Sequence, residues 1–225
     1  MKKTEFIESQ KNYWEKDHSK RRSPYHPCVK ALFEPRANYL ENLINNPLNK
    51  SIIDLGCGNG YFGVYLEPRF KNLLSVDSSK SMLLLNPCVN KLHAEVQDLP
   101  IEDNAFDIAT CSHLLHHLDE SDQVKAIKEM RRISKKNIVV FEPYRNNPLN
   151  FLFGIIVKEE RESLKFSKKY ITKIFHTAGV ENVKVEIEGC VLPNKSPIFW
   201  APLGKFINKT FLRNFGFYMK VTAML

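Results

Sequence analysis

Three glycines at alternate positions constrain this chain more than any other feature. In the run SIIDLGCGNGYFG, residues 51–63, a short apolar strand leads to Asp54 and then to the glycines. Glycines at this spacing let the backbone turn sharply, so that a ligand can lie against main-chain N–H groups at the start of a helix. A dinucleotide-binding turn needs a further glycine three residues after Gly58. Tyr61 stands there instead, so the pattern excludes the usual NAD-binding turn.

A second acid stands where a nucleoside-binding fold needs one. The run KNLLSVDSSKSM predicts a strand that ends at Asp77, followed by a helix with Ser78 or Ser79 as its N-cap. Asp77 lies close to the offset of about 20 residues at which such folds present a carboxylate to ribose hydroxyls. An acid that only caps the next helix is the alternative. Because Asp77 occurs together with the glycine turn, we favour a ribose-binding role for it.

A third motif identifies the family that the chain resembles. In AEVQDLPIEDNAFDIATCSHLLHHLDE, Asp98 and Leu99 follow a short strand, and a polar turn, a fourth strand and a His-rich segment come next. In this order, the motifs between residues 51 and 143 resemble the UbiE-type branch of the class I S-adenosylmethionine (SAM)-dependent methyltransferases. That branch includes many small-molecule and quinone-ring methyltransferases. The resemblance implies SAM as the cofactor, with Asp98 on the adenine amino group and the Leu99 backbone against the ring.

The resemblance also implies which residues bind SAM, at the turns that follow the first four strands. These residues are Asp54, Gly56, Cys57, Gly58, Asn59, Gly60, Asp77, Ser78, Met82, Asp98, Leu99 and Ser112.

Short apolar runs alternate with helical patterns along the chain. The expected strands are 51–55, 72–77, 91–95, 105–111, 137–142, 182–188 and 216–224. The expected helices are 28–45, 60–66, 79–85, 121–133 and 167–178, and the segment HLLHHL is expected to open a helix as well. This alternation predicts an α/β fold, Rossmann-like and doubly wound, with a mostly parallel seven-stranded sheet and helices on both faces. In the family that the chain resembles, the last strand is antiparallel.

Two segments outside the expected sheet are predicted to select the acceptor. Residues 1–48 are expected to form a helical cap over the SAM site, and residues 49–225 the methyltransferase domain. Residues 146–166 form an insertion after the fifth strand, long enough to be a functional lid. Its apolar run PLNFLFGIIV either lines a hydrophobic pocket or packs on the core. The predicted substrate contacts are Tyr13, Tyr25, Arg145 and Phe151, although Tyr13 is also suited to anchoring the cap by burial.

Candidate catalytic residues follow the fourth and fifth expected strands. The SAM sulfonium is already activated, so methyl transfer needs a positioned acceptor, and a base only where the acceptor must lose a proton. His113 and His116 carry imidazoles that titrate near neutral pH, and His117 is a weaker candidate. Glu142 and Tyr144 are expected at the carboxyl end of the fifth strand, facing the reaction site. A purely structural role is the alternative for the histidines.

The net charge of +8 comes partly from one basic, aromatic region. The connection 189–215 before the last strand carries lysines and phenylalanines and no acid. With residues up to 220, this region is suited to RNA binding, to contact with an anionic membrane, or to a partly buried helix whose lysines extend to water.

Cysteine usage and hydropathy indicate the compartment in which the protein is expected. The five cysteines form no C-x-x-C pair and show no metal-ligand spacing, so we predict reduced thiols, a cytoplasmic protein and no metal site. The N-terminus lacks the apolar region of a secretory signal, and no apolar run is long enough for a transmembrane segment.

The favoured function is methyl transfer from SAM to a small, apolar or lipid-like acceptor, on an O, N or C atom. The alternatives are an RNA-modifying methyltransferase that uses the basic C-terminal region, and a SAM-binding subunit without catalysis.

Overall fold

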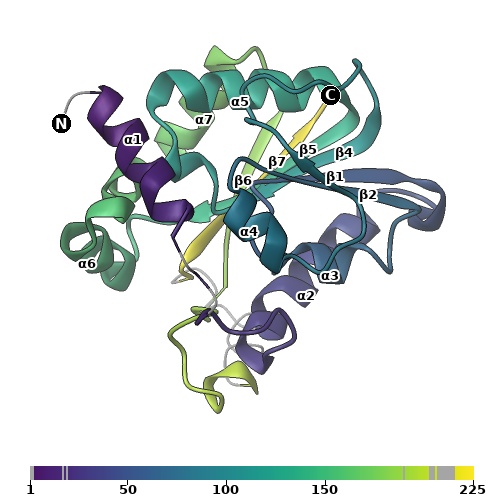
Figure 1. Cartoon of the computed structure of the whole chain (residues 1–225). Coiled ribbons are helices and arrows are strands. Elements are labelled where there is room, and N and C mark those ends of the chain that lie inside the picture. Colours follow the sequence, from purple (N-terminus) through teal and green to yellow (C-terminus); the bar gives the residue numbers. More distant parts are fainter. Residues whose placement is uncertain (1–2, 17, 19, 190, 203–205, 207–215) are drawn as a thin grey trace.

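A seven-stranded sheet forms the centre of the computed structural model (Figure 1), which describes residues 3–16, 18, 20–189, 191–202, 206 and 216–225. The strands are β1 (Ser51–Leu55), β2 (Asn72–Asp77), β3 (Lys91–His93), β4 (Phe106–Ser112), β5 (Ser134–Pro143), β6 (Val183–Glu188) and β7 (Tyr218–Met224). Their order is β3-β2-β1-β4-β5-β7-β6. The first five strands run parallel, whereas β7 pairs antiparallel with both β5 and β6. The expected doubly wound sheet with an antiparallel last strand is therefore confirmed.

The helices include the five that the sequence predicts and two more. They are α1 (Lys3–Trp14), α2 (Pro27–Asn42), α3 (Gly63–Leu66), α4 (Lys80–Leu85), α5 (Glu120–Ile133), α6 (Pro148–Ile156) and α7 (Lys168–Thr177), with 3-10 turns η1 (Pro47–Asn49), η2 (Leu115–His117) and η3 (Lys158–Lys165). The prediction that HLLHHL opens a helix is wrong, because that segment forms only the single turn η2. Asp119 then caps α5 by accepting hydrogen bonds from the backbone N–H groups of Ser121 and Asp122.

Helices cover both faces of the sheet. Because neighbouring residues of a strand point to opposite sides, each strand contributes side chains to both layers. On β1, Ile53 packs in the cluster that contains α5 and α7, whereas Ile52 packs in the cluster that contains α2 and α3. On β5, Val140 and Phe141 divide between the same two clusters. This arrangement confirms helices on both faces and places the carboxyl ends of the parallel strands at one open edge.

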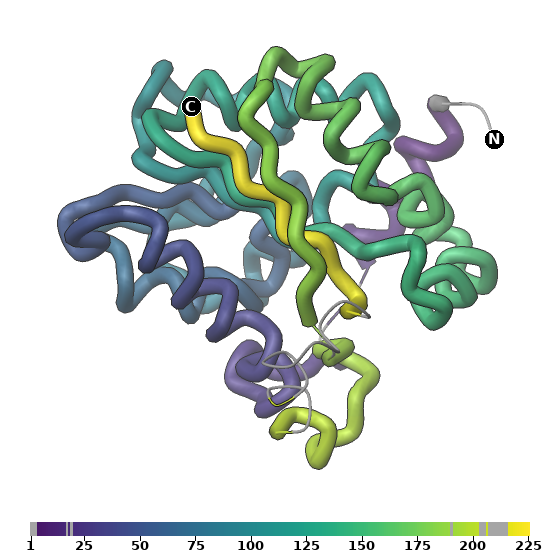
Figure 2. Tube along the Cα trace, turned by 180° about the vertical axis from the view of Figure 1, so that it is seen from behind, coloured from purple at the N-terminus to yellow at the C-terminus, as the bar shows by residue number. Residues whose placement is uncertain are grey.

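Residues 1–48 divide into two separate parts. The helix α2 packs against the sheet, whereas α1 lies apart from it, beside the α6 region (Figures 1 and 2). Between them, Arg22 donates hydrogen bonds to the carbonyls of Pro193 and Ser196, at 2.9 and 2.7 Å. The Cys28 thiol also donates to the Ser196 carbonyl, at 3.3 Å. The start of the chain is therefore held by residues close to its other end, as Figure 2 shows from behind.

Only part of the basic region 189–220 can be described. Among its described lysines, Lys220 lies over the Tyr39 ring at 3.6 Å and pairs with Glu186 at 3.2 Å, so it belongs to the folded sheet. The predicted basic and aromatic positions at 205, 209, 211, 213 and 215 lie outside the described residues. Within the described part of the chain, none of the helices combines the length and apolarity needed to cross a membrane.

Candidate functional site

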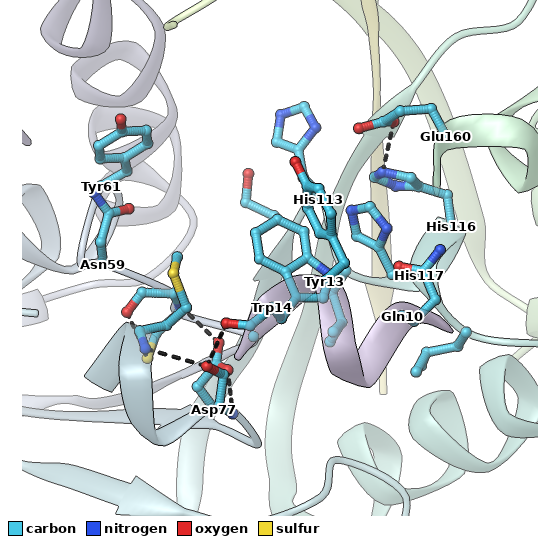
Figure 3. Close-up of a pocket in the computed structure, with 18 of the residues that line it drawn as sticks. Gln10, Tyr13, Trp14, Asn59, Tyr61, Asp77, His113, His116, His117 and Glu160 are labelled. Carbon is cyan, nitrogen blue, oxygen red and sulfur yellow. Dashed lines mark hydrogen bonds and ion pairs between the residues drawn. The ribbon is translucent and has the colours of Figure 1, made fainter. Parts of the chain in front are cut away.

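A cavity of about 1320 Å³ opens at the carboxyl ends of the parallel strands. Asp54, Asp77 and Ser112, at or next to the ends of β1, β2 and β4, line its floor. The helix α1 and the inner face of α6 also line it. In Figure 3, Asn59 and Asp77 lie on one side, the rings of His116 and His117 on the other, and Trp14 between them. The cavity is therefore large enough for two ligands side by side, in two chemically different halves.

The glycine turn shapes the first half. All three of its glycines have positive φ, at 67°, 51° and 81° in chain order. A side chain at Gly58 would place its Cβ 3.1 Å from the terminal methyl of Met82. The N–H of Gly58 donates to Asp77 at 2.7 Å, so the turn is tied to the end of β2. Gly58 itself lines the cavity.

Two buried acids, Asp54 and Asp77, stand beside this turn. One carboxylate oxygen of Asp54, Oδ2, is buried and has no hydrogen-bond partner among the described residues. Burial, and then the charge of Asp77, raise the pKa of Asp54 well above its ordinary value. Burial likewise raises the pKa of Asp77, although the N–H groups of Ser79 and Gly58 oppose that shift. An unpartnered buried acceptor that faces a cavity is suited to a ligand that carries hydroxyl or ammonium donors.

Most of the predicted cofactor residues line the cavity. Besides the two acids, they include Gly56, Cys57, Gly58, Asn59, Ser78, Met82 and Ser112. Gly60 does not line it, because its Cα faces the side chain of Asn86, 2.5 Å from where a Cβ would lie. Gly60 therefore serves the turn itself rather than a ligand.

The prediction for Asp98 and Leu99 is not supported by the structure. Neither residue lines the cavity: Asp98 is exposed, and Leu99 is buried in the core with its N–H donated to Glu129 at 3.0 Å. The residues that do line it are those directly after β3, Ala94 to Gln97. The rule that ligands bind beyond strand ends could have indicated them, since β3 ends at His93, earlier than predicted.

His113 lines the cavity in a strained conformation. Its φ is +60°, in the left-handed region that non-glycine residues rarely adopt. The buried guanidinium of Arg36 lies 3.3 Å from the Nε2 atom of His113 and donates to Ser112 Oγ at 2.9 Å. Because a guanidinium only donates, Nε2 accepts and the ring proton is on Nδ1. Burial, and then the charge of Arg36, hold the pKa of His113 well below its usual range.

Glu142 and Tyr144 do not face the cavity, contrary to their predicted placement. The Glu142 carboxylate is 0% exposed and accepts the N–H groups of Leu114 and Leu115, at 3.0 and 2.7 Å, and the His116 ring at 2.6 Å. The carboxylate thereby satisfies the backbone N–H groups at the start of η2. Tyr144 packs against the main core cluster. From this strand, Pro143 lines the cavity instead.

His116 and His117 form the wall of the second half. Burial disfavours the charged form of His116, but the charges and hydrogen bonds of Glu142 and Glu160 raise its pKa to about 10. For His117, burial and then the charge of His116 lower the pKa to about 3. The centroids of the two rings lie 3.9 Å apart with the rings tilted by 45°, and Trp14 lies edge-on to His117 at 4.9 Å.

Of the predicted substrate contacts, only Tyr13 lines the cavity. Tyr25 is 68% exposed and Arg145 is also exposed, and neither reaches it. Phe151 lies on the outer face of α6, at 45% exposure. The inner face of α6 carries the apolar residues that do line the cavity, at helical spacing. They are Leu149, Leu152, Phe153 and Ile156.

Comparisons with known proteins show the family of the central segment. Residues 53–141 match the model of the Methyltransferase domain family. The malonyl-[acyl-carrier protein] O-methyltransferase of Buchnera aphidicola is 34% identical over 117 residues, covering 50% of this chain and 47% of that protein. The ubiquinone biosynthesis O-methyltransferase of Acinetobacter baumannii is 27% identical over 139 residues, covering 55% of this chain and 56% of that protein. The chain thus spans about half the length of the curated relatives it matches.

Solved structures share the fold. A SAM-dependent methyltransferase of Thermotoga maritima, described as a possible histamine N-methyltransferase, superposes with a TM-score of 0.65 at 21% identity, covering 88% of this chain and 91% of that one. A SAM-dependent methyltransferase of Archaeoglobus fulgidus gives 0.63 at 18% identity, covering 87% and 97%. Residues 53–141 therefore match a methyltransferase domain, and the chain shares the fold of these SAM-dependent methyltransferases.

Proposed function

We propose that this chain, which carries a SAM-dependent methyltransferase domain, transfers the methyl group of SAM to a small, apolar or lipid-like acceptor. The observation that carries the proposal is the two-part cavity: a glycine turn with buried acids in one half, and an apolar helix face in the other. The acceptor would lie under α6, and the cofactor against the turn. Four described cysteines are free and buried, which supports the proposal of a reducing, cytoplasmic setting.

The first half fits SAM. The unpartnered Oδ2 of Asp54 offers an acceptor for a cofactor donor, and Asp77 keeps lone pairs beyond those used by Gly58 and Ser79. We assign the ribose hydroxyls to Asp77 and the close main-chain contact to Gly58. Bound SAM supplies a methyl group on a sulfonium, and this chain's own residues have to hold the acceptor in line with it.

Positioning rather than base catalysis is supported by the ring contacts of the histidines. Nε2 of His113 is engaged by Arg36, and the two ring nitrogens of His116 are engaged by Glu142 and Glu160. The structure therefore leaves neither ring poised to take a proton from an acceptor through those atoms. We propose that His113 holds the acceptor through its Nδ1–H, as a donor.

Asp77→Ala should weaken SAM binding by about 1.5–3 kcal/mol, the usual loss for hydrogen bonds to a charged group. Isothermal titration calorimetry of the purified chain measures this, with NAD as a comparison ligand that should bind far more weakly. Asp98→Ala is the matched control, because Asp98 is an exposed acid outside the cavity. Equal SAM affinity in Asp77→Ala and the unaltered chain would remove Asp77 from the ribose site.

Polar substitutions on the inner face of α6 should abolish most activity toward an apolar acceptor. Leu152 and Ile156 line the cavity, whereas Phe151 and Ile155 on the same helix do not, and all four are about half exposed or more. Each buried aliphatic contact with an acceptor is worth about 1.5–3 kcal/mol, so Leu152→Asp with Ile156→Asp should lower kcat/KM more than about tenfold.

The measurement is methyl transfer from labelled SAM to fractionated small-molecule, lipid and RNA extracts, followed by kinetics on the fraction that accepts label. Phe151→Asp with Ile155→Asp adds the same charges to the same helix and should keep most of the activity. Equal losses in both pairs would trace the effect to the added charge, and full activity in both would contradict an apolar acceptor under α6.

A further inference from the structure

A cluster of two imidazoles and a carboxylate stands in the acceptor half of the cavity. One ligand atom each from His116, His117 and Glu160 lies within 4.8 Å of the others. All three residues line the cavity, and Figure 3 shows the two rings side by side next to the carboxylate. His116 Nε2 already lies 3.3 Å from Glu160 Oε2. We propose that this cluster is a binding site for a divalent first-row transition metal ion, with Zn²⁺ as its natural type.

The donor set matches that type of ion. Neutral imidazole nitrogens suit zinc, iron, copper and nickel, whereas magnesium and calcium take oxygen ligands. Catalytic zinc sites use three protein ligands and keep one position open. Because these three residues line the cavity, an open position would face the acceptor.

The surroundings of the rings match a metal site too. A histidine that binds a metal usually donates its other ring N–H to a carboxylate or a backbone carbonyl. His116 Nδ1 lies 2.6 Å from the Glu142 carboxylate. The Nδ1 atom of His117 is buried and has no hydrogen-bond partner among the described residues. That unpartnered atom is the observation that points to a missing ligand rather than to a closed network.

Charge supports a cation at this place. Glu142 and Glu160 place one carboxylate at each ring nitrogen of His116, the first fully buried and the second partly exposed. A divalent ion at this place would contact ligand atoms of His116, His117 and Glu160 together.

The cluster escapes detection by sequence spacing. His116 and His117 are adjacent in η2, whereas Glu160 comes from η3, after the sixth helix. Chain folding alone brings them together, since η3 packs against η2. These contacts support the binding of the ion. Its role, to hold an oxygen or nitrogen atom of the acceptor, rests on the proposed function.

The test is titration of the chelator-treated chain with Zn²⁺ against a chromophoric chelator, and with Co²⁺ for its visible d–d absorption. We expect one ion per chain. Glu142→Gln should weaken binding about 10–100-fold, and loss of a direct ligand, in His117→Ala or Glu160→Gln, should weaken it further. His176→Ala is the control, since that imidazole is exposed on α7, and it should bind as the unaltered chain does.

Circular dichroism shows whether each variant folds, and calorimetry shows whether it still binds SAM. If His117→Ala fails to fold, Glu160→Gln carries the test, because its side chain is partly exposed. An unaltered chain that binds no Zn²⁺, or ligand variants that bind it as tightly as His176→Ala, would overturn the site. SAM binding would be retained in either case, so failure of the metal site is separate from failure of the proposed function.

Discussion

Gly58→Val should nearly abolish SAM binding, with an affinity loss of more than about a hundredfold. Gly58 has a φ of +51°, and its backbone faces the cavity where the cofactor is proposed to lie. A left-handed conformation costs a residue with a Cβ about 1–2 kcal/mol, so the turn would shift. The shifted turn would also lose hydrogen bonds to Asp77 and to SAM. Each hydrogen bond to a charged group is worth about 1.5–3 kcal/mol, so the loss of two lowers the SAM affinity by more than about a hundredfold.

Calorimetry measures that loss, and Gly179→Val separates it from backbone strain. Gly179 also has positive φ, at 81°, but its Cα faces only the flexible end of Arg131, and neither residue lines the cavity. This control should lose stability and keep its SAM affinity. A Gly58→Val chain that folds and binds SAM normally would mean that the cofactor does not approach this turn.

Arg36→Ala should lower the free energy of unfolding by about 3 kcal/mol or more. The Arg36 side chain is 1% exposed, pairs with Glu188 at 2.7 Å and lies between the rings of Phe141 and Tyr218, at 4.6 and 4.7 Å. Removing one partner of a buried ion pair typically costs about 3–5 kcal/mol. The lower end applies here, because Glu188 is partly exposed and regains some water.

Urea denaturation monitored by circular dichroism gives that difference. Lys173→Ala is the control, since its pair with Glu120 is exposed on both sides and should be worth less than about 1 kcal/mol. Similar losses in the two variants would show that Arg36 is not the internal tie that its contacts indicate.

The sheet could be predicted from the sequence because most of its parallel strands contain a short apolar run that ends at a turn signal. β1 and β2 occupy the predicted ranges. β5 begins earlier than predicted, at Ser134, because its first residues include exposed lysines that an apolar pattern does not reveal. Backbone pairing with β4 extends the strand there, and such pairing leaves no mark in composition.

The site could be predicted only where its residues follow strand ends directly. Asp54 and Asp77 meet this condition, and both line the cavity. Glu142 also stands at a strand end, but its carboxylate turns to the N–H groups of η2, a partner that only the tertiary fold supplies. For α6, helical periodicity separates two faces without saying which one points inward, so the sequence does not distinguish Phe151 from the neighbours that line the cavity.

The hydrogen bonds between Arg22 and residues 193–196 have a consequence for how the cavity opens. Arg22 and Ser196 are 174 residues apart in the chain. These two hydrogen bonds lie outside the sheet and are only partly buried, so breaking them leaves the strand pairing untouched. The segment that follows α1 is then expected to detach at a lower free energy than global unfolding, while the sheet stays intact. Exchange of SAM for its product would need only this local detachment, and no hinge within the sheet.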